Sequence, residues 1–259
     1  MRILLVSDIH ANWPALAAID EPHDVCLCLG DLVDYGPDPA RCVRWAMEHA
    51  SYAVRGNHDH GVAQGIPVTG ENSFRYLTRV TRPHMWDALD AGERRWLLQL
   101  PVTQRVTLGQ KRFLLVHATP RDPLDEYLLR DEAGWARRLE NVEADIVCVG
   151  HSHMQFKLKI GDKIVINPGS VGLPRDGDPR AAYAVIDDDR IELKRTAYPV
   201  EETLARIDAA PWPQRAKDMM SHVLRVGRLP AAPPERPTST TGADPGDAEI
   251  DPEDAPIPV

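Results

Sequence analysis

Short apolar segments, each followed at once by polar side chains that can bind metal ions, are the feature that most constrains the fold of this chain. Short continuous apolar runs bounded by turn residues predict buried strands of a sheet covered on both faces. Five such runs are ILLVS, VCLCLG, YAVRG, FLLV and IVCVG. The carboxylate, amide and imidazole groups that follow them belong to Asp8, His10, Asp31, Asn57, His58, Asp59, His117, His151 and His153. Because ligands of open α/β sheets bind at the carboxyl ends of the strands, we expect these groups to share one cleft.

The order of the expected elements predicts an α/β fold. Strands are expected over 3–6, 25–29, 52–54, 113–116, 145–149 and 163–166, and helices over 14–19, 39–50 and 132–142. The first three strands alternate with helices, as in βαβ units. Later segments predict two hairpins, 105–108 with 111–116 and 182–186 with 190–196. Two mixed sheets covered by helices fit this order best.

Two further segments define the expected organisation. Residues 62–101 form an insert with an apolar stripe that is interrupted near Gly92. The stripe predicts helices that pack over the sheet, and a role in lining a substrate cleft is the alternative. From Leu229 onward the chain is rich in proline and acidic residues, which predicts disorder. We therefore expect one domain over 1–228 and a disordered tail over 229–259.

Composition limits the classes of partner and the compartment. The net charge of −9 argues against long-range attraction of nucleic acid, although a local basic cleft would still allow it. The first residues, MRILLVSDI, lack the pattern of a signal peptide, and the sequence contains no apolar run of membrane-spanning length. We expect a cytoplasmic protein without a membrane partner. Cys26, Cys28 and Cys148 lie in apolar runs and are interpreted as buried hydrophobic residues rather than metal or redox groups.

The residue types at the strand ends indicate a catalytic metal site. Imidazole suits Mn, Fe, Ni and Zn, carboxylate suits harder ions, and no cysteine joins the set, which disfavours a closed structural zinc site. About seven of these groups can bind a metal ion, which exceeds the needs of one tetrahedral ion but suits two ions that share a carboxylate. Taken singly, each motif is better explained as a turn, a helix cap or a solvated loop, and only their order and placement together indicate a site. Mn²⁺ is the expected ion, with Fe, Ni and Zn as alternatives.

These motifs, taken in order, resemble the signature of the calcineurin-like metallophosphoesterases. The resemblance rests on Asp8-Ile9-His10, Gly30-Asp31, Gly56-Asn57-His58-Asp59, His117 and Gly150-His151-Ser152-His153, and it covers about residues 1–198. The segments SDIHAN and INPGSVGLPRDGDPRAAY are similar to the small prokaryotic phosphodiesterase branch. The resemblance implies a four-layer α/β/β/α sandwich of two mixed sheets flanked by helices, with a dinuclear metal centre.

The resemblance also implies a role for each site residue. One ion would be held by Asp8, His10, Asp31 and His153, and the other by Asp31, Asn57, His117 and His151, so that Asp31 bridges. His58 would protonate the leaving oxygen, and Asp34 in GDLVDYG would orient His58. Asn57 would also contact the substrate.

One position departs from the Ser/Thr phosphatases that the chain resembles more distantly. Those enzymes carry a phosphate-binding arginine where this chain has Tyr35, and a monoester dianion would lose a bidentate partner there. This departure favours a diester substrate. Arg175 could reach a substrate phosphate, with a surface-loop arginine as the alternative, and His60 is expected to face solvent.

The expected function is metal-dependent hydrolysis of a phosphodiester by a hydroxide that two metal ions activate. The substrate would be a small phosphate ester or a nucleotide. The alternatives are a phosphomonoesterase, a dinucleoside-polyphosphate hydrolase, or a catalytically weak binding scaffold with the same fold. The presence of His58 and of every ligand argues against the scaffold.

Overall fold

The computed structural model describes residues 1–188 and 190–229, so the expected tail lies outside the described residues from position 230 onward. The strands are β1 (Arg2–Val6), β2 (Val25–Cys28), β3 (Tyr52–Ala53), β4 (Thr103–Leu108), β5 (Lys111–Val116), β6 (Ile146–Cys148), β7 (Gln155–Ile160), β8 (Lys163–Pro168), β9 (Ala181–Asp187) and β10 (Arg190–Thr196). The helices are α1 (Trp13–Ala17), α2 (Pro39–His49), α3 (Asn57–Gln64), α4 (Ser73–Ala88), α5 (Ala91–Gln99), α6 (Glu132–Leu139), α7 (Val200–Ala209) and α8 (Gln214–Val226).

The strands form two mixed sheets of five strands each, as the sequence predicted. Their orders are β10-β9-β1-β2-β3 and β4-β5-β6-β8-β7. In the first sheet β1, β2 and β3 are parallel, and in the second β5, β6 and β8 are parallel. The hairpin partners β4 and β10 run antiparallel at the edges, which confirms both predicted hairpins. Strand β7 was not predicted, because its alternation of buried and exposed residues differs from the continuous apolar runs of the central strands.

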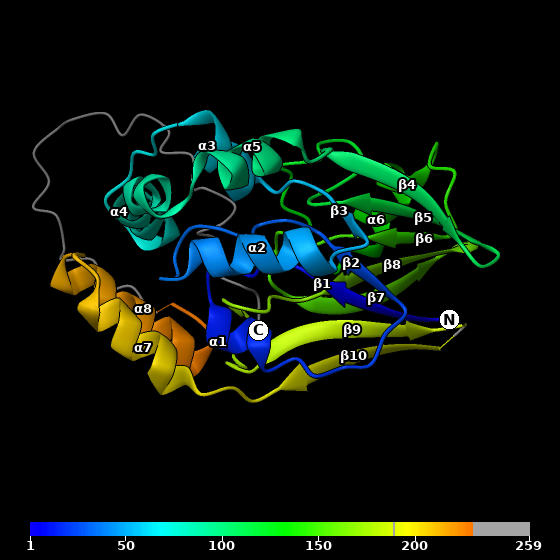
Figure 1. Ribbon diagram of the computed structural model, residues 1–259. Helices are drawn as coiled ribbons and strands as arrows, with labels where there is room; N and C mark the ends of the chain where they lie inside the picture. Colours follow the sequence, from blue (N-terminus) through cyan, green and yellow to red (C-terminus); the bar gives the residue numbers. More distant parts are fainter. Residues whose placement is uncertain (189, 230–259) are drawn as a thin grey trace, which may run out of the picture.

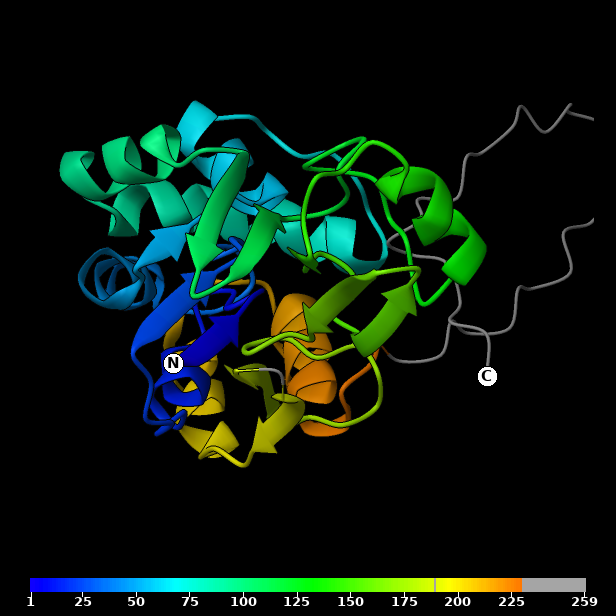
Figure 2. The ribbon, with the colours of Figure 1, turned by 90° about the vertical axis from the view of Figure 1, so that its right-hand side faces the viewer.

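The two sheets pack face to face and helices cover their outer faces, which gives the four expected layers (Figures 1 and 2). Apolar residues of both sheets, including Leu5, Leu27, Leu115 and Ile166, form one buried cluster. A second cluster lies on the other face of the first sheet, under α1, α2 and α5. A third lies between the second sheet and α6, where Trp135 is buried.

The insert forms α4 and α5, and the interruption between them lies before the predicted one. Helix α4 ends at Ala88 and α5 begins at Ala91, so Gly92 is inside α5. The Asp90 carboxylate accepts hydrogen bonds from the backbone N–H groups of Gly92 and Glu93, at 2.7 and 2.8 Å. This capping box, a local polar signal, fixes where α5 begins. Helix α4 packs with α8 in a separate buried cluster.

Two other sequence interpretations concern membranes and thiols. Among residues 1–188 and 190–229, no helix is long and apolar enough to cross a membrane. Cys26, Cys28 and Cys148 are buried free thiols in the sheets. Burial raises the pKa of Cys26 to about 12, so this thiol stays protonated and acts as a small apolar residue.

Candidate metal centre and active site

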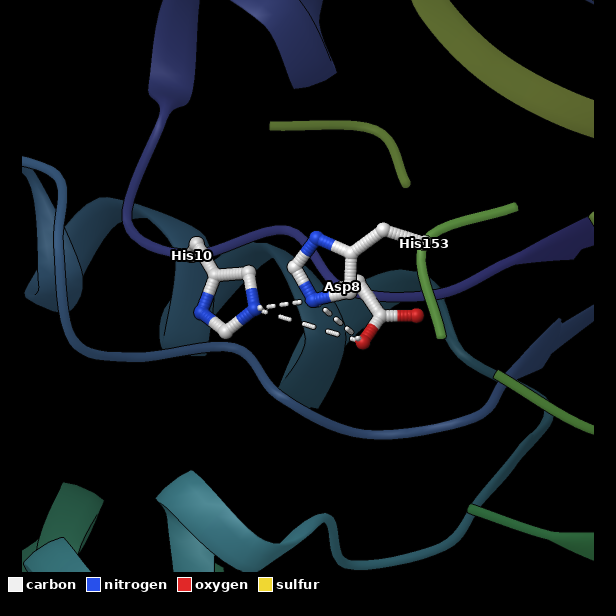
Figure 3. Close-up of side chains that lie close together, drawn as sticks. All are labelled: Asp8, His10 and His153. Carbon is white, nitrogen blue, oxygen red and sulfur yellow. Dashed lines mark hydrogen bonds and ion pairs between the residues drawn. The ribbon is translucent and has the colours of Figure 1, made fainter. Parts of the chain in front are cut away.

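The structure brings six of the strand-end residues into two buried clusters. Asp8, His10 and His153 form the first cluster, and in the second the ligand atoms of Asp31, His117 and His151 likewise lie within 4.8 Å of one another. In the first cluster His153 Nε2 is 3.3 Å from Asp8 Oδ1 and 3.2 Å from His10 Nε2 (Figure 3). These side chains follow β1, β2, β5 and β6, so parallel strand ends converge as the sequence predicted.

Strained backbone at the strand ends aims these side chains. Asp8, His10, Asp31, His151 and His153 have φ angles between 46° and 63°. Non-glycine residues adopt this left-handed region rarely, and such strain clusters at functional sites. Cross-strand hydrogen bonds hold the strained turns, for example from the N–H of Asp8 to the carbonyl of Gly30 at 3.0 Å.

Two glycines allow the strand ends to approach closely. A Cβ on Gly30 would lie 2.3 Å from the backbone nitrogen of Gly56, and one on Gly56 would lie 2.0 Å from Asp31 Oδ1. Either methyl group would push apart the ends of β2 and β3. The glycines in Gly30-Asp31 and Gly56-Asn57-His58-Asp59 are therefore steric requirements of the site.

Backbone carbonyls fix the histidine rings so that Nε2 points into the clusters. The Nδ1 atom of His10 lies 2.9 Å from the carbonyl oxygen of Val33, and that of His117 lies 2.8 Å from the carbonyl oxygen of Leu29. His153 uses the carbonyl oxygen of Leu173 in the same way. With the Nδ1 proton donated to a carbonyl, a neutral ring carries its lone pair on Nε2.

Buried oxygen atoms at the strand ends lack donors. Asp8 Oδ1 and Asn57 Oδ1 are buried and have no hydrogen-bond partner among the described residues, and Asp31 Oδ2 pairs with His117 Nε2 at 3.1 Å. Buried polar atoms left in this way cost free energy unless a cation or another partner satisfies them. The donor set, imidazole with carboxylate and amide oxygen, therefore fits divalent metal ions.

The pKa values of the cluster histidines show how strongly the buried carboxylates attract positive charge. Burial lowers the pKa of His117, but the charges of Asp31 and Asp8 outweigh it and raise that pKa to about 10. A proton then supplies the cation that the Asp31 carboxylate requires. Burial lowers the pKa of His10 and His153 well below the ordinary value, which keeps both rings neutral, the form that binds metal.

Asp31 lies between the two clusters. Its Oδ2 atom is 3.1 Å from His117 Nε2 in the second cluster and 3.8 Å from His10 Nε2 in the first. Its Oδ1 atom accepts a hydrogen bond from the N–H of His58 at 2.9 Å, which fixes the carboxylate against the first turn of α3.

His58 forms a buried pair with Asp34 beside the clusters. Its Nδ1 atom lies 2.7 Å from Asp34 Oδ2, and its ring centroid is 5.0 Å from that of His10. The Tyr35 hydroxyl lies 3.4 Å from His58 Nε2 and accepts a hydrogen bond from Thr78 at 3.0 Å. His58 belongs to neither of the two candidate metal clusters.

A cavity of about 530 Å³ opens beside His58. Its walls include Asn57, His58 and His60 of α3, the segment Ile66–Pro67–Val68–Thr69, Arg75, Thr78 and Arg82 of α4, and Leu124 and Asp125. The first half of the insert therefore lines a cleft beside His58, whereas no residue of the apolar stripe over 84–101 is among the residues that line it, so a substrate-cleft role for the stripe stays a prediction. His60, expected to face solvent, is half-buried in the cavity wall.

Arg175 is not a surface-loop arginine, so that alternative is wrong. The side chain is buried, and the guanidinium carbon lies 3.7 Å from the ring centroid of Phe74. Burial raises the pKa of Asp8 to about 6, against a smaller opposing effect of the Arg175 charge, and burial lowers the pKa of His153, an effect to which the Arg175 charge adds. Arg175 thus acts electrostatically on the first cluster, although it is not among the residues that line the cavity.

Two residues of the site were missed or underestimated from the sequence. Asp59 caps α3 and also accepts hydrogen bonds from the N–H groups of Asp31, Leu32 and Gly56. Arg82 of α4 donates two hydrogen bonds to Asp34. The capping position of Asp59 is a local signal, whereas no short-range pattern connects Arg82 with Asp34.

The comparison with protein families decides the identity of this fold and site. A family model described as the calcineurin-like phosphoesterase superfamily domain matches residues 1–190. The chain belongs to this superfamily. It is a phosphoesterase of the hydrolase class that uses divalent metal ions, and its two acceptor clusters are candidate sites for those ions.

Individual relatives agree with this assignment. An uncharacterized protein of Methanocaldococcus jannaschii is 31% identical over 231 residues, which cover 79% of this chain and 91% of the relative. Phosphodiesterase YfcE of Escherichia coli is 26% identical over 215 residues, covering 74% and 91%. The crystal structure of a metallophosphoesterase from Sphaerobacter thermophilus matches with a TM-score of 0.74 and 30% identity over 88% of this chain and 99% of that one.

Proposed function

We propose that this phosphoesterase hydrolyses phosphodiesters at a dinuclear metal centre. The observation that carries the proposal is the position of Asp31, whose carboxylate reaches both buried acceptor clusters next to the His58–Asp34 pair. One carboxylate shared between two clusters is the arrangement that two bridged ions require. The 26% identity with a phosphodiesterase supports the same reaction class.

The proposed ligands are those of the two clusters together with Asn57. Asp8, His10, Asp31 and His153 would hold one ion, and Asp31, Asn57, His117 and His151 the other. When bound, two divalent cations lower the pKa of an attacking water and offset charge on the phosphoryl oxygens. Mn²⁺ is the ion we propose first, and Fe, Ni or Zn would use the same donors.

Each of the remaining polar side chains at the site has a separate proposed role toward the substrate. His58 lines the cavity and is oriented by Asp34, so it would donate a proton to the leaving oxygen as the ester bond breaks. The Asn57 amide would donate to a phosphoryl oxygen, and Arg175 would add positive charge behind the first cluster. Tyr35 offers a hydroxyl rather than a cation, which suits a diester monoanion better than a monoester dianion.

A dinucleoside-polyphosphate hydrolase is the second candidate, favoured by the cavity. Its volume of about 530 Å³ and its walls of Arg75, Thr69 and Thr78 leave room for a large, polar leaving group beside His58. We keep the boundaries 1–228 for the catalytic domain, a disordered tail from 229 and a cytoplasmic location as predictions.

A metal-titrated substrate panel tests the proposal. Protein stripped by chelation is assayed with bis(4-nitrophenyl) phosphate, 4-nitrophenyl phosphate and diadenosine tetraphosphate before and after addition of Mn²⁺, Fe²⁺, Ni²⁺ or Zn²⁺. We expect no activity without metal, recovery with Mn²⁺, and a higher kcat/KM for the diester than for the monoester. Full activity of the stripped protein would contradict the metal requirement, and faster monoester turnover would contradict the diester preference. No turnover of any substrate with two bound ions would favour the scaffold.

A further inference from the structure

One face of α4 packs directly on the Asp34–Tyr35 turn. Thr78 donates a hydrogen bond to the Tyr35 hydroxyl, and Thr81 Oγ1 accepts one from the Tyr35 N–H at 3.0 Å. The sulfur of Met85 lies 3.3 Å from the backbone nitrogen of Asp34. With Arg82, these residues have the three- and four-residue spacing of a single helix face. Part of the insert is therefore built around the carboxylate that contacts His58.

Arg82 makes the strongest of these contacts. Its Nε and Nη2 atoms donate to the same oxygen, Asp34 Oδ2, at 3.0 and 2.6 Å, and its Nη1 donates to the carbonyl of Ile66 at 3.2 Å. The residue is buried in the cavity wall. The guanidinium group is thus held at both ends, by the carboxylate and by the insert backbone.

Asp34 depends on Arg82 for its orientation. The carboxylate is fully buried, and its side-chain partners among residues 1–188 and 190–229, His58 and Arg82, both bind Oδ2. Oδ1 has no hydrogen-bond partner in the part of the chain that the structure describes. Without Arg82, a single hydrogen bond to His58 would remain, and the carboxylate could rotate about its Cβ–Cγ bond. A buried carboxylate without a cationic partner is also costly.

Gly61 of α3 provides the space that this arrangement needs. A Cβ at Gly61 would lie 2.2 Å from Arg82 Nη1 and 2.6 Å from Cζ. Glycine inside a helix destabilises it relative to alanine. Its presence here is explained by the guanidinium group that lies against it.

We infer that Arg82 is a positioning residue for the proton donor: it fixes the Asp34 carboxylate, which in turn fixes the His58 ring toward the leaving group. The inference rests on the proposed function of His58. It adds that the insert, through α4, belongs to the catalytic machinery, so displacement of α4 would change proton donation without touching a metal ligand.

The test compares Arg82→Met with Arg79→Met on diesters that differ in their leaving group. Arg79 is one helical turn away and binds the carbonyl of Gly70 and the Glu71 carboxylate, so Arg79→Met removes an arginine from α4 without touching Asp34. The substrates are methyl 4-nitrophenyl phosphate and methyl phenyl phosphate. We expect Arg82→Met to lower kcat about 10- to 100-fold on the phenyl ester, part of the ~10²–10⁴-fold effect of a general acid, and much less on the nitrophenyl ester. Arg79→Met should lower neither.

A double mutant separates positioning from direct substrate binding. If Arg82 acts through Asp34, then Arg82→Met should cause little further loss in an Asp34→Asn background. Equal losses on both esters, a raised KM with unchanged kcat, or full additivity with Asp34→Asn would overturn the inference and make Arg82 a substrate contact. Gly61→Ala, which displaces the guanidinium without removing it, should reproduce the leaving-group pattern more weakly.

A measurement without substrate tests the positioning role of Arg82 independently of the proposed phosphodiester hydrolysis. In ¹⁵N-histidine NMR spectra of the metal-free protein, the His58 Nδ1 proton, assigned with His58→Ala, should exchange with water faster in Arg82→Met than in wild type or Arg79→Met. An unchanged exchange rate in a folded Arg82→Met variant would refute the positioning role. If wild type hydrolyses no diester yet this exchange difference appears, the proposed function fails while the structural role of Arg82 stands.

Discussion

The role of Asp59 gives a prediction whose size follows from the structure. Its carboxylate is fully buried and accepts three backbone hydrogen bonds, from Asp31 at 2.7 Å, Leu32 at 2.8 Å and Gly56 at 3.1 Å. Asp59→Ala would leave three buried N–H groups without a partner. Hydrogen bonds to charged groups contribute about 1.5–3 kcal/mol each, but relief of the buried charge offsets part of the loss. We expect a decrease of about 4 kcal/mol in the free energy of unfolding.

Asp59→Asn should be less destabilising than Asp59→Ala, because the amide oxygen can still accept hydrogen bonds. Oδ2 accepts from both Asp31 and Gly56, so an amide oxygen placed there keeps two of the three hydrogen bonds. The amide NH₂ would then face the N–H of Leu32, and one donor would remain unsatisfied. The expected loss is about 2 kcal/mol.

Urea unfolding of the chelated protein at pH 7 measures these differences. The matched control is Asp122→Ala, because Asp122 also accepts two backbone hydrogen bonds, from Leu124 and Asp125, but is exposed. Water replaces that carboxylate, so the control should lose less than about 1 kcal/mol. A loss for Asp59→Ala no larger than that of the control, at an unchanged m-value, would refute the reasoning.

The other predictions concern the reaction and one surface ion pair. His58→Ala should retain both metal ions and lose about 10²–10⁴-fold in kcat on a poor leaving group, with a smaller loss on a nitrophenyl ester; loss of a metal ion in this variant would identify His58 as a ligand instead. Asp31→Asn should lower metal stoichiometry and turnover more than any other single ligand substitution, and retention of two tightly bound ions would argue against bridging. A hydrogen bond from Arg112 lowers the pKa of Asp145 from 3.8 to about 2. The stabilisation that ionised Asp145 gives the folded state is therefore complete above pH 4 and is lost as the pH falls toward 2. The difference in urea midpoint between wild type and Asp145→Asn should shrink over that range, and a difference that stays constant with pH would contradict this.

The sequence predicted the sheet strands and their ends well, because both are local properties of the chain. An apolar run such as residues 113–116 is followed directly by His117, and the parallel arrangement then brings distant strand ends together. The carboxylate between the two clusters, Asp31, was placed correctly at the end of β2 for the same reason.

What could not be predicted depends on packing between distant segments. Arg82 lies 48 residues from Asp34 and sits on a helix whose pattern indicates only that one face is buried. A sequence pattern does not distinguish a buried arginine from a solvent-facing one. The same holds for Arg175, which lies in a loop and is buried. The second function of Asp59, holding the end of β2 as well as capping α3, depends on the close approach of two strand ends that only the fold creates.

The origin of each cluster has a mechanical consequence. In the first, Asp8 and His10 come from the sheet that contains β1, whereas His153 follows β6 of the other sheet; in the second, Asp31 follows β2, whereas His117 and His151 follow β5 and β6. An ion in either cluster would therefore act as a crosslink between the two sheets, joining segments such as His10 and His153 that are 143 residues apart. The sheets could not separate at this edge without first releasing the ion. Metal loading should for this reason slow amide hydrogen exchange in both sheets at once, far beyond the residues that touch the metal.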